Sequence, residues 1–448
     1  MSKFWLGIDC ATQSVRGALL DENRQIHLRV SEDLAPVLRG DDGRLTQDPH
    51  SWTSAIEKIV HECSAFASKV GGSIVAMTIS ATSGTFVITD LQGKPIAPAA
   101  MYNDGRASSP LARTAAIIKE VGQGSYLFAH TPEFVIAHLS GKPLVEIGTD
   151  WSHALKTGVD FQNRSWSSSA IAAASELNVR LPELIAPGTL LGRTAQGEIP
   201  IYAGMTDGCT AQISVGSSAL GSAVTTLGTT MVIKIVSPQE VSGPGFYSHL
   251  LPQGRWLTGG ASNLGGISLK PFTGDVAEWD QKALNHGPSS TVSYPLVGIG
   301  ERFPIANSHM ERIFTTSPVN DVDEYRATLE GIAFAERLSY ETLAKAGAPL
   351  NRQLFTVGGG SRSKIWNSIR ATVLNRSISI VKEAGSDIGA AMIARASSEG
   401  ADLAEGIDRF NSSTAEQVNP EINQVSMYEE KYQKFLELVG PMKNQQIR

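Results

Sequence analysis

The chain has 448 residues, of which 42% are hydrophobic and 18% charged, and its formal net charge is −6 at pH 7. This length allows two domains with substantial cores. The small negative charge gives no electrostatic reason to expect nucleic acid or an anionic membrane as a partner, and no stretch reaches the roughly 18 apolar residues of a membrane span. Three cysteines are too few for a disulfide framework and too widely spaced for a zinc site, so we expect a cytoplasmic protein.

The chain begins with two apolar segments joined by a polar turn. Residues 4–8 and 15–20 predict the strands of a β-hairpin, with Asp9 at the end of the first strand. Backbone N–H groups and hydroxyls in such a turn can bind a phosphate. Asp9 would then orient a metal ion beside that phosphate. The alternative is an acid that serves only the turn.

Strands and helices then alternate as far as about residue 217, which predicts a layered α/β domain. The predicted strands are 25–30, 73–80 and 86–90, and the predicted helices are 48–69 and 165–177. A short buried strand, 200–204, leads to Asp207 at the start of a helix that runs to Val215. The N-terminus of this helix favours an anion.

A second domain is predicted from residue 217, after a segment of small residues. It opens with a hairpin of strands 223–227 and 231–236 around Gly228 and Thr229. The later predicted elements are a strand from Trp256 into a glycine-rich helix start, a polar loop at 274–293, a long core helix at 323–346, a strand and turn at 355–360, a helix from Asp387 and a last helix at 425–438 that folds back on the first domain.

Two strand-terminal acids and three Gly/Thr/Ser turns are thus spread over the chain, which is the layout of an ATP-dependent phosphotransferase. The motifs occur in the order GIDCATQSVRG (7–17), SATSGT (80–85), YNDGRA (102–107), GMTDG (204–208), TTLGTT (225–230), GGGSRSKIW (358–366) and DIGAAMIA (387–394). This series resembles the FGGY family of carbohydrate kinases. The resemblance implies an α/β fold of two actin-like (ribonuclease H-like) ATPase domains with a cleft between them.

A narrower resemblance, to the D-ribulose kinases of cyanobacteria and plants, some of them called xylulose kinase-like, rests on four segments: 154–158, 247–249, 257–266 and 300–305. It implies transfer of the ATP γ-phosphate to the terminal C5 hydroxyl of a ketopentose, D-ribulose first and D-xylulose second. The implied organisation is a sugar-binding domain at 1–216, a nucleotide-binding domain at 217–400 and a C-terminal segment at 401–448. A monomer or homodimer is expected.

By the same resemblance, Asp207 is the general base that takes the proton from the sugar hydroxyl, and Asp9 holds Mg²⁺, directly or through water. The implied sugar-binding residues are Asp9, Thr82, Ser83, Asp104, Arg106 and Asp207. The implied ATP-binding residues are Thr12, Gln13, Ser14, Arg16, Gly228, Thr229, Gly260, Gly358, Gly359, Ser363 and Trp366.

Several of these roles have structural alternatives: Ser83 can simply form the turn, and Asp207 can cap the helix that it begins. Asp104 and Arg106 can form an ion pair with each other, and Trp366 can be a core residue. His153 is interpreted as a hydrogen-bond partner and not as a base.

The sequence also departs from the family pattern. Ala11 stands where the family has Gly, Ser363 stands where it has Asn, and the chain after Arg106 lacks a long insertion that helps to wall the sugar pocket. If Ala11 needed a positive φ, the phosphate turn would be strained. Two alternatives therefore stay open: a kinase for another sugar or polyol such as glycerol, or a non-catalytic sugar- or nucleotide-binding relative. The presence of both Asp9 and Asp207 favours catalysis.

Overall fold

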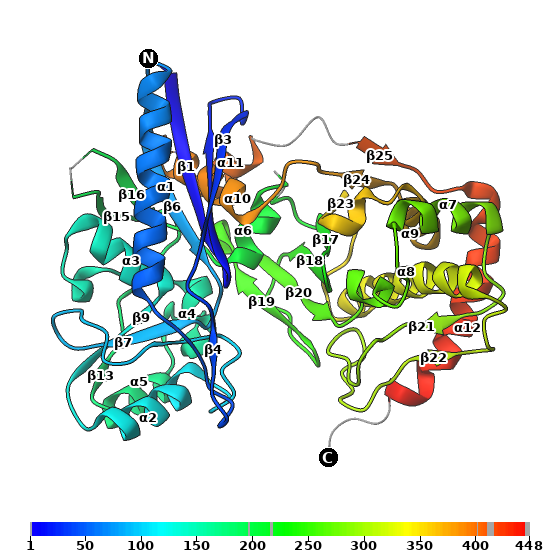
Figure 1. Cartoon of the computed structure of the whole chain (residues 1–448), viewed down its shortest axis with the longest axis horizontal. Helices are drawn as coiled ribbons and strands as arrows, with labels where there is room; N and C mark the ends of the chain where they lie inside the picture. The colour runs from blue at the N-terminus through cyan, green and yellow to red at the C-terminus, as the bar shows by residue number, and fades with distance from the viewer. Residues whose placement is uncertain (1, 196–197, 216–217, 401, 410–415, 444–448) are drawn as a thin grey trace. The chain divides into compact units, whose positions relative to one another are not determined.

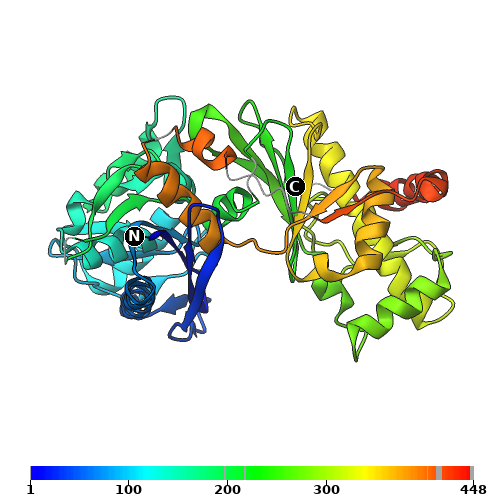
Figure 2. The same ribbon diagram turned by 90° about the horizontal axis from the view of Figure 1, so that it is seen from above.

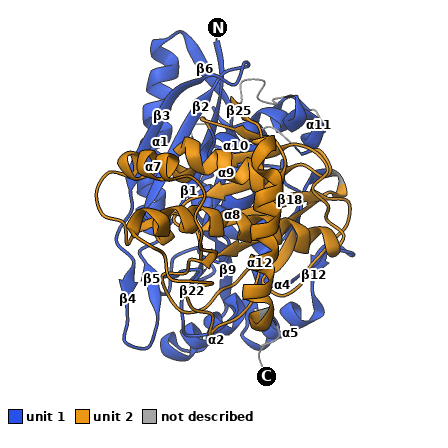
Figure 3. Cartoon of the chain, turned by 90° about the vertical axis from the view of Figure 1, so that its right-hand side faces the viewer, with its two compact units in different colours: residues 1–218, 249–253, 384–411 blue, residues 219–248, 254–383, 412–448 orange. Residues whose placement is uncertain are grey.

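A computed structural model describes residues 2–195, 198–215, 218–400, 402–409 and 416–443 (Figure 1). The chain divides into two compact units (Figure 3). Unit 1 comprises residues 1–218, 249–253 and 384–411, and unit 2 comprises residues 219–248, 254–383 and 412–448. The domain boundaries predicted at 216–217 and at 401 lie outside the described residues.

The main sheet of unit 1 has six strands in the order β15-β16-β6-β1-β2-β3. β1 (Ser2–Cys10) pairs antiparallel with β2 (Ser14–Leu20) and parallel with β6 (Gly72–Ala81), which confirms the predicted N-terminal hairpin. The outer strands are β3 (Ile26–Asp33), β16 (Pro200–Ala203) and β15 (Leu190–Arg193).

The two faces of β1 meet different helices, because successive side chains of a strand point to opposite faces. Phe4, Leu6 and Ile8 share a core cluster with Ile56 and Ile59 of α1 (His50–Lys69). This helix is the blue one seen end-on in Figure 2. The even-numbered residues of β1 therefore anchor α1.

The odd-numbered residues of β1 face α10 (Ser386–Ser398). Trp5 packs with Ala394 of this helix. A Cβ atom on Gly7 would lie only 1.9 Å from the carbonyl oxygen of Asp387, so the glycine allows the helix backbone to lie directly on the strand. Asp9, two residues further on, ends the same face.

A second sheet of unit 1 has the order β13-β9-β7-β8-β5-β4. Its strands are β13 (Val179–Arg180), β9 (Tyr126–His130), β7 (Phe86–Thr89), β8 (Ala99–Ala100), β5 (Leu45–Gln47) and β4 (Leu38–Arg39). Two short pairs are β10 (Thr149–Asp150) with β14 (Leu184–Ile185), and β11 (Val159–Asp160) with β12 (Ser165–Trp166). The other helices of the unit are α2 (Pro110–Val121), α3 (Thr131–Ser140), α4 (Trp151–Gly158), α5 (Ser168–Glu176), α6 (Asp207–Ile213) and α11 (Leu403–Asp408).

A seven-stranded sheet, which belongs to unit 2 except for the last two residues of β19, has the order β19-β20-β18-β17-β23-β24-β25. Its strands are β19 (Phe246–Leu250), β20 (Trp256–Ser262), β18 (Met231–Ser237), β17 (Ala223–Leu227), β23 (Leu354–Val357), β24 (Ile378–Ile380) and β25 (Glu416–Val418). A short pair joins β21 (Ser293–Tyr294) to β22 (Ile313–Phe314), and the helices are α7 (Val276–His286), α8 (Asp321–Lys345), α9 (Lys364–Leu374) and α12 (Val425–Lys443).

Residues 276–286, which the sequence predicts as part of a polar loop, form the helix α7. The side chain of Asp275 accepts a hydrogen bond from the N–H of Ala277 and caps the first turn. Trp279 packs against Phe272 and Tyr325, and Ala283 is buried. Because only a few apolar residues of α7 make contacts, the sequence of this helix has the composition of a polar loop.

The structure also differs from the sequence expectation for two helices. α10, expected within the nucleotide-binding domain, belongs to unit 1. α12, expected to pack on the first domain, belongs to unit 2, where Tyr428, Tyr432 and Phe435 share a core cluster with Phe334 of α8. An apolar stripe shows that a helix is packed, but it does not specify the partner. Among the helices described, none has the length and hydrophobicity of a membrane span.

Candidate active site

Asp9 is a buried carboxylic acid at the end of β1, with 5% of its surface exposed. Within the described residues, its Oδ1 atom is buried and has no hydrogen-bond partner. Burial, together with the charges of Asp207 and Asp387, raises the pKa of Asp9 from 3.8 to about 7, although Arg16 and Arg29 oppose this shift. An unpartnered carboxylate oxygen among acids is suited to a cation.

Asp207 is the first residue of α6. Its Oδ1 accepts a hydrogen bond from the N–H of Gly208 at 2.7 Å. Burial of the carboxyl raises its pKa above 3.8, even though the hydrogen bonds from Gly208 and Thr82 and the charges of His153 and Lys156 favour the ionised form. A carboxyl with a raised pKa is a stronger base than an ordinary aspartate.

Buried side chains hold the start of α6. The N–H of Thr206, the N-cap residue, donates to Oγ of Ser152 at 2.9 Å, and Ser152 donates to Asp150. Asp150 also pairs with Nδ1 of His153, which is 1% exposed. Although burial lowers the pKa of His153, the Asp150 carboxylate raises it above its ordinary value. The interpretation of His153 as a hydrogen-bond partner is confirmed.

α10 supports α6 from another side. The hydroxyl of Ser386 donates to the carbonyl oxygen of Asp207 at 3.1 Å. A Cβ atom on Gly389 would lie 1.9 Å from the carbonyl oxygen of Thr210, so the two helices are in backbone contact. The position of Asp207 therefore depends on α10 as well as on Ser152.

The turn at residues 82–85 lies between β6 and β7 and carries the predicted sugar-binding hydroxyls. Thr82 is partly exposed, whereas Ser83 is buried and its Oγ has no partner among the described residues. Thr82 lines a small cavity that Thr12 of the phosphate turn also lines, which brings these two predicted sites together within unit 1.

Asp104 and Arg106 form a buried ion pair, with Nη2 and Oδ2 2.8 Å apart and side-chain exposures of 0% and 7%. Both carboxylate oxygens accept hydrogen bonds from the guanidinium group. This geometry supports the alternative in which the two residues pair with each other, and a sugar-binding role of Asp104 and Arg106 stays a prediction.

The phosphate turn of unit 1 is closed by a hydrogen bond from the N–H of Ala11 to the carbonyl of Ser14, 3.1 Å long. Thr12 and Ser14 are partly exposed, and Gln13 and Arg16 are exposed. Ala11 is not among the four non-glycine residues with positive φ in the described chain. The strain considered for this alanine is therefore not present.

Two predicted nucleotide turns of unit 2 lie together, because β17 and β23 are parallel neighbours and end at the same edge of the sheet. Gly358 has a φ of +93°, and a Cβ atom there would lie 2.5 Å from the carbonyl oxygen of Leu227, next to Gly228. Thr229 is exposed, and the space around Gly359 is open to at least 4 Å. Only glycine fits position 358 without strain.

Three further residues predicted to bind ATP also have structural roles in unit 2. Gly260 is buried in β20, and a Cβ atom there would lie 2.5 Å from the carbonyl oxygen of Gly245, so packing of the protein explains this glycine. Trp366 is 1% exposed in the core cluster of unit 2, which supports its alternative as a core residue, and its contact with ATP stays a prediction. The Oγ of Ser363 accepts a hydrogen bond from the N–H of Trp366 and thereby caps the N-terminus of α9.

Asp387 has a place in the site that the sequence did not predict. This residue is fully buried at the start of α10, and its two oxygens accept hydrogen bonds of 2.7 and 2.9 Å from Arg29 of β3. In the sequence, the only sign of this role was an acid before a run of small residues. That pattern does not identify Arg29 of β3 as the partner. Asp387 adds a third carboxyl group to the surroundings of Asp9.

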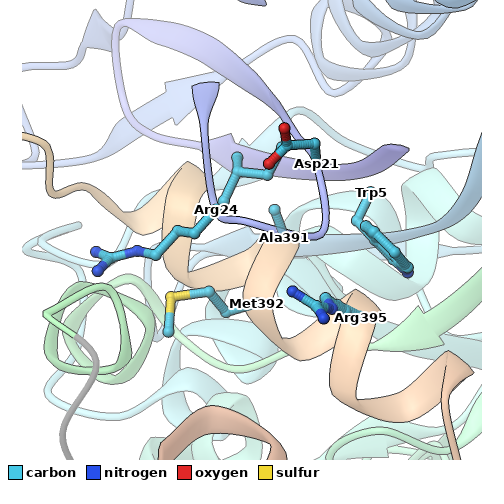
Figure 4. Close-up of a pocket in the computed structure, with 7 residues that line it drawn as sticks. Trp5, Asp21, Arg24, Ala391, Met392 and Arg395 are labelled. Atoms are coloured by element: carbon cyan, nitrogen blue, oxygen red, sulfur yellow. The ribbon is translucent and has the colours of Figure 1, made fainter. Parts of the chain in front are cut away.

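A different pocket, between the β1–β2 hairpin and α10, is lined by Trp5, Asp21, Arg24 and Arg395 (Figure 4). Its volume of about 10 Å³ is close to that of one water probe. Arg24 donates to the carbonyl of Ser214, and Arg395 donates to that of Glu22. These guanidinium groups brace backbone segments, and the pocket is too small for a sugar.

Comparison with known proteins places these features in a family. The N-terminal domain model of the FGGY family of carbohydrate kinases matches residues 4–131, and the C-terminal domain model matches residues 223–398. The chain therefore belongs to the FGGY family of carbohydrate kinases. It is a phosphotransferase with an alcohol group as acceptor, and the enzymes of this family use ATP as the phosphate donor.

Similar proteins extend the match over the whole chain. A xylulose kinase from Lactococcus lactis is 25% identical over 444 residues, which cover 87% of each chain. Among solved structures, a "xyloylose kinase" from Brucella ovis has a TM-score of 0.86 at 22% identity and covers 98% of this chain and 99% of its own. A ligand-bound xylulose kinase from Lactobacillus acidophilus has a TM-score of 0.85 at 19% identity, with 99% of both chains covered. These matches confirm the predicted two-domain α/β fold.

The carboxylates of the candidate site fit the way in which proteins usually bind Mg²⁺. The described residues contain no group of three or more His, Cys, Asp or Glu side chains that could hold a metal ion by themselves. Mg²⁺ usually binds to one or two carboxylates and completes its shell with water and substrate phosphates. The unpartnered Oδ1 of Asp9 fits this mode of binding.

Proposed function

We propose that the protein is an ATP-dependent pentulose kinase that transfers the γ-phosphoryl group to the C5 hydroxyl of a ketopentose. D-ribulose is the first candidate, on the resemblance of the motifs, and D-xylulose is the second, on the names of the relatives. The observation that carries the proposal is the proximity of Asp9 and Asp207 within unit 1, close enough for the charge of Asp207 to raise the pKa of Asp9.

Asp207 acts as the general base. Phosphoryl transfer needs positioning and charge neutralisation more than covalent chemistry, and a carboxylate within reach of the sugar hydroxyl accepts its proton as the oxygen approaches phosphorus. The raised pKa of Asp207 and its anchoring through Thr206, Ser152 and Ser386 support this role. The Thr82 hydroxyl, which favours the ionised form of Asp207, and the buried Ser83 orient the sugar.

Asp9 would hold Mg²⁺, which neutralises charge on the phosphate oxygens. Thr12, Gln13, Ser14 and Arg16 in unit 1 offer hydroxyl, amide and guanidinium donors to phosphates. In unit 2, the turns of Gly228, Thr229, Gly358 and Gly359 offer backbone N–H groups to the nucleotide. Ser363, next to the second turn, caps α9 and gives this turn a fixed end.

The test is a coupled assay of ADP release with Mg-ATP and a panel of D-ribulose, D-xylulose, L-ribulose, glycerol and D-fructose. We expect turnover with one ketopentose well above that with the other compounds. Asp207→Ala should reduce kcat by about 10²- to 10⁴-fold, the usual contribution of a general base. Asp160→Ala, which removes an aspartate from an exposed turn of the same unit, should leave kcat unchanged.

Two results would contradict the proposal. Faster turnover with glycerol or D-fructose than with both ketopentoses would mean that the enzyme transfers phosphate to another substrate. Sugar binding without any turnover in the wild-type protein would instead indicate a non-catalytic relative.

A further inference from the structure

Lys156 lies across the turn that carries the predicted sugar-binding hydroxyls. Its Nζ donates a hydrogen bond of 2.9 Å to the carbonyl oxygen of Ser83 and lies 5.7 Å from the centre of the Tyr102 ring. A Cβ atom on Gly84 would be 2.9 Å from Cδ of Lys156. With its φ of +88°, Gly84 both shapes the turn and leaves space for the lysine stem.

A second cation holds the same turn from the interior. Arg113 of α2 is 4% exposed, and its Nη1 donates to the carbonyls of Gly84 and Met101 at 3.3 and 2.8 Å. Two cations therefore hold the turn, the buried Arg113 and the exposed Lys156.

The ammonium group of Lys156 has more N–H donors than its contact with Ser83 uses. It carries three N–H groups, and one hydrogen bond, to Ser83, is present within the described residues. The residue as a whole is exposed, whereas burial of its ammonium group lowers the pKa of Lys156. Its charge also favours the ionised form of the Asp207 carboxyl, so the ammonium group lies within electrostatic range of the proposed base.

We propose that Lys156 is a sugar-binding residue, whose ammonium group donates a hydrogen bond to an oxygen of the acceptor sugar at the site formed by Thr82, Ser83 and Asp207. This inference rests on the proposed function and adds a residue to which the motif resemblance gave no role. The acceptor must carry an oxygen, as a hydroxyl or a carbonyl group, next to the one that is phosphorylated or further along the chain. Lys156 makes its contribution to sugar affinity and not to ATP affinity.

Lys156→Met is the main test, because methionine keeps most of the apolar stem and removes all three donors. Lys142→Met is the matched control: Lys142 is also exposed in unit 1 and its Nζ donates to a backbone carbonyl, that of Leu191, at 2.8 Å. A charged hydrogen bond to a ligand is worth about 10- to 100-fold in affinity. We therefore expect Lys156→Met to raise KM for the sugar by that factor while KM for ATP stays within about twofold.

Steady-state kinetics with each substrate varied in turn, and calorimetric titration of the sugar without ATP, give the two readouts. The control Lys142→Met should show the wild-type KM for both substrates. If Lys156→Met does not fold, Lys156→Gln tests the same point, because it removes the ammonium charge and shortens the side chain while it keeps a polar end.

The inference is wrong if the sugar KM and the sugar affinity of the folded variants equal those of the wild type. It is also wrong if Lys142→Met raises the sugar KM as much as Lys156→Met, since the effect would then be one of stability. These outcomes are separate from failure of the proposed function, in which the wild-type protein itself shows no sugar-dependent release of ADP.

Discussion

Arg370 and Glu336 form an ion pair with 0% exposure of either side chain, with Nε and Oε2 2.6 Å apart. The guanidinium group makes a second bond, of 2.7 Å, to Oε1 of the same carboxylate. Thr225 of β17 and Thr356 of β23 complete the network, through bonds to Glu336 and Arg370. The pair thus ties α8 and α9 to two neighbouring strands of unit 2.

Removing one partner of this pair should strongly destabilise unit 2. Glu336→Ala leaves the guanidinium group of Arg370 buried without its counter-charge, which costs about 3–5 kcal/mol. The exposed pair of Lys58 and Glu32 in unit 1 gives the comparison, and Lys58→Ala should cost no more than about 1 kcal/mol. Urea unfolding followed by circular dichroism measures both. A loss below about 1 kcal/mol in Glu336→Ala would contradict the assigned network.

The stability of the metal-free protein should depend on the protonation of Asp9. Its pKa is raised from 3.8 to about 7 in the folded state, so the folded protein binds a proton that the unfolded chain releases between these two values. The contribution of Asp9 to the free energy of unfolding therefore falls as the pH rises from about 4 to 7. Above pH 7 the ionised group opposes folding by up to roughly 4 kcal/mol.

Asp9→Asn removes this dependence. In buffer with a chelator, we expect the variant to exceed the wild type in stability at pH 8 and to approach it near pH 4, while its kinase activity is lost. Chemical unfolding of both proteins over this pH range provides the measurement. A difference that is constant with pH would show that the pKa of Asp9 is not raised.

Gly389→Ala should disturb α10 and, with it, the catalytic base. The added methyl group would lie 1.9 Å from the carbonyl oxygen of Thr210, and overpacking of this kind typically costs about 1–3 kcal/mol. Because α6 carries Asp207, we also expect kcat to fall. Gly440→Ala in α12, where nothing lies within 4 Å, should be neutral or stabilise by up to about 1 kcal/mol. Thermal unfolding and ADP release together distinguish the two variants.

Restoring the glycine of the family pattern in the phosphate turn should bring no gain. Because Ala11 does not have a positive φ, Ala11→Gly adds freedom to the unfolded chain without relieving strain, at a cost of about 0.4–1 kcal/mol. We expect kcat and KM for ATP within about twofold of the wild type. A large increase in activity would mean that Ala11 does limit the turn.

The parts of the fold that the sequence predicted are those with strong local periodicity. The β1–β2 hairpin, α1 and α8 follow from their apolar spacing, and the alternation of strands and helices predicts the α/β class. Local signals could not show where α10 and α12 pack, because small or apolar residues fit several partners equally well. α7 was missed because it is largely polar.

The same limit applies to the site. Asp9 and Asp207 were identified because each stands beside a strand or helix end in a motif of fixed order. Asp387 and Lys156 meet their neighbours only through contacts distant in sequence, with Arg29 and with Ser83. Tryptophan and glycine also occur at positions that serve only packing. The burial of Trp366 and Gly260 could therefore be known only from the structure.

The place of α10 in the chain has a consequence for synthesis. β1 is made first, but the helix that covers its Trp5 face follows only after the long segment of unit 2. While the ribosome translates that segment, the nascent sheet keeps an apolar face open to water or to chaperones. We therefore expect shortened chains that end before residue 384 to aggregate, and no single cut of the polypeptide to yield a complete, independently folding first unit.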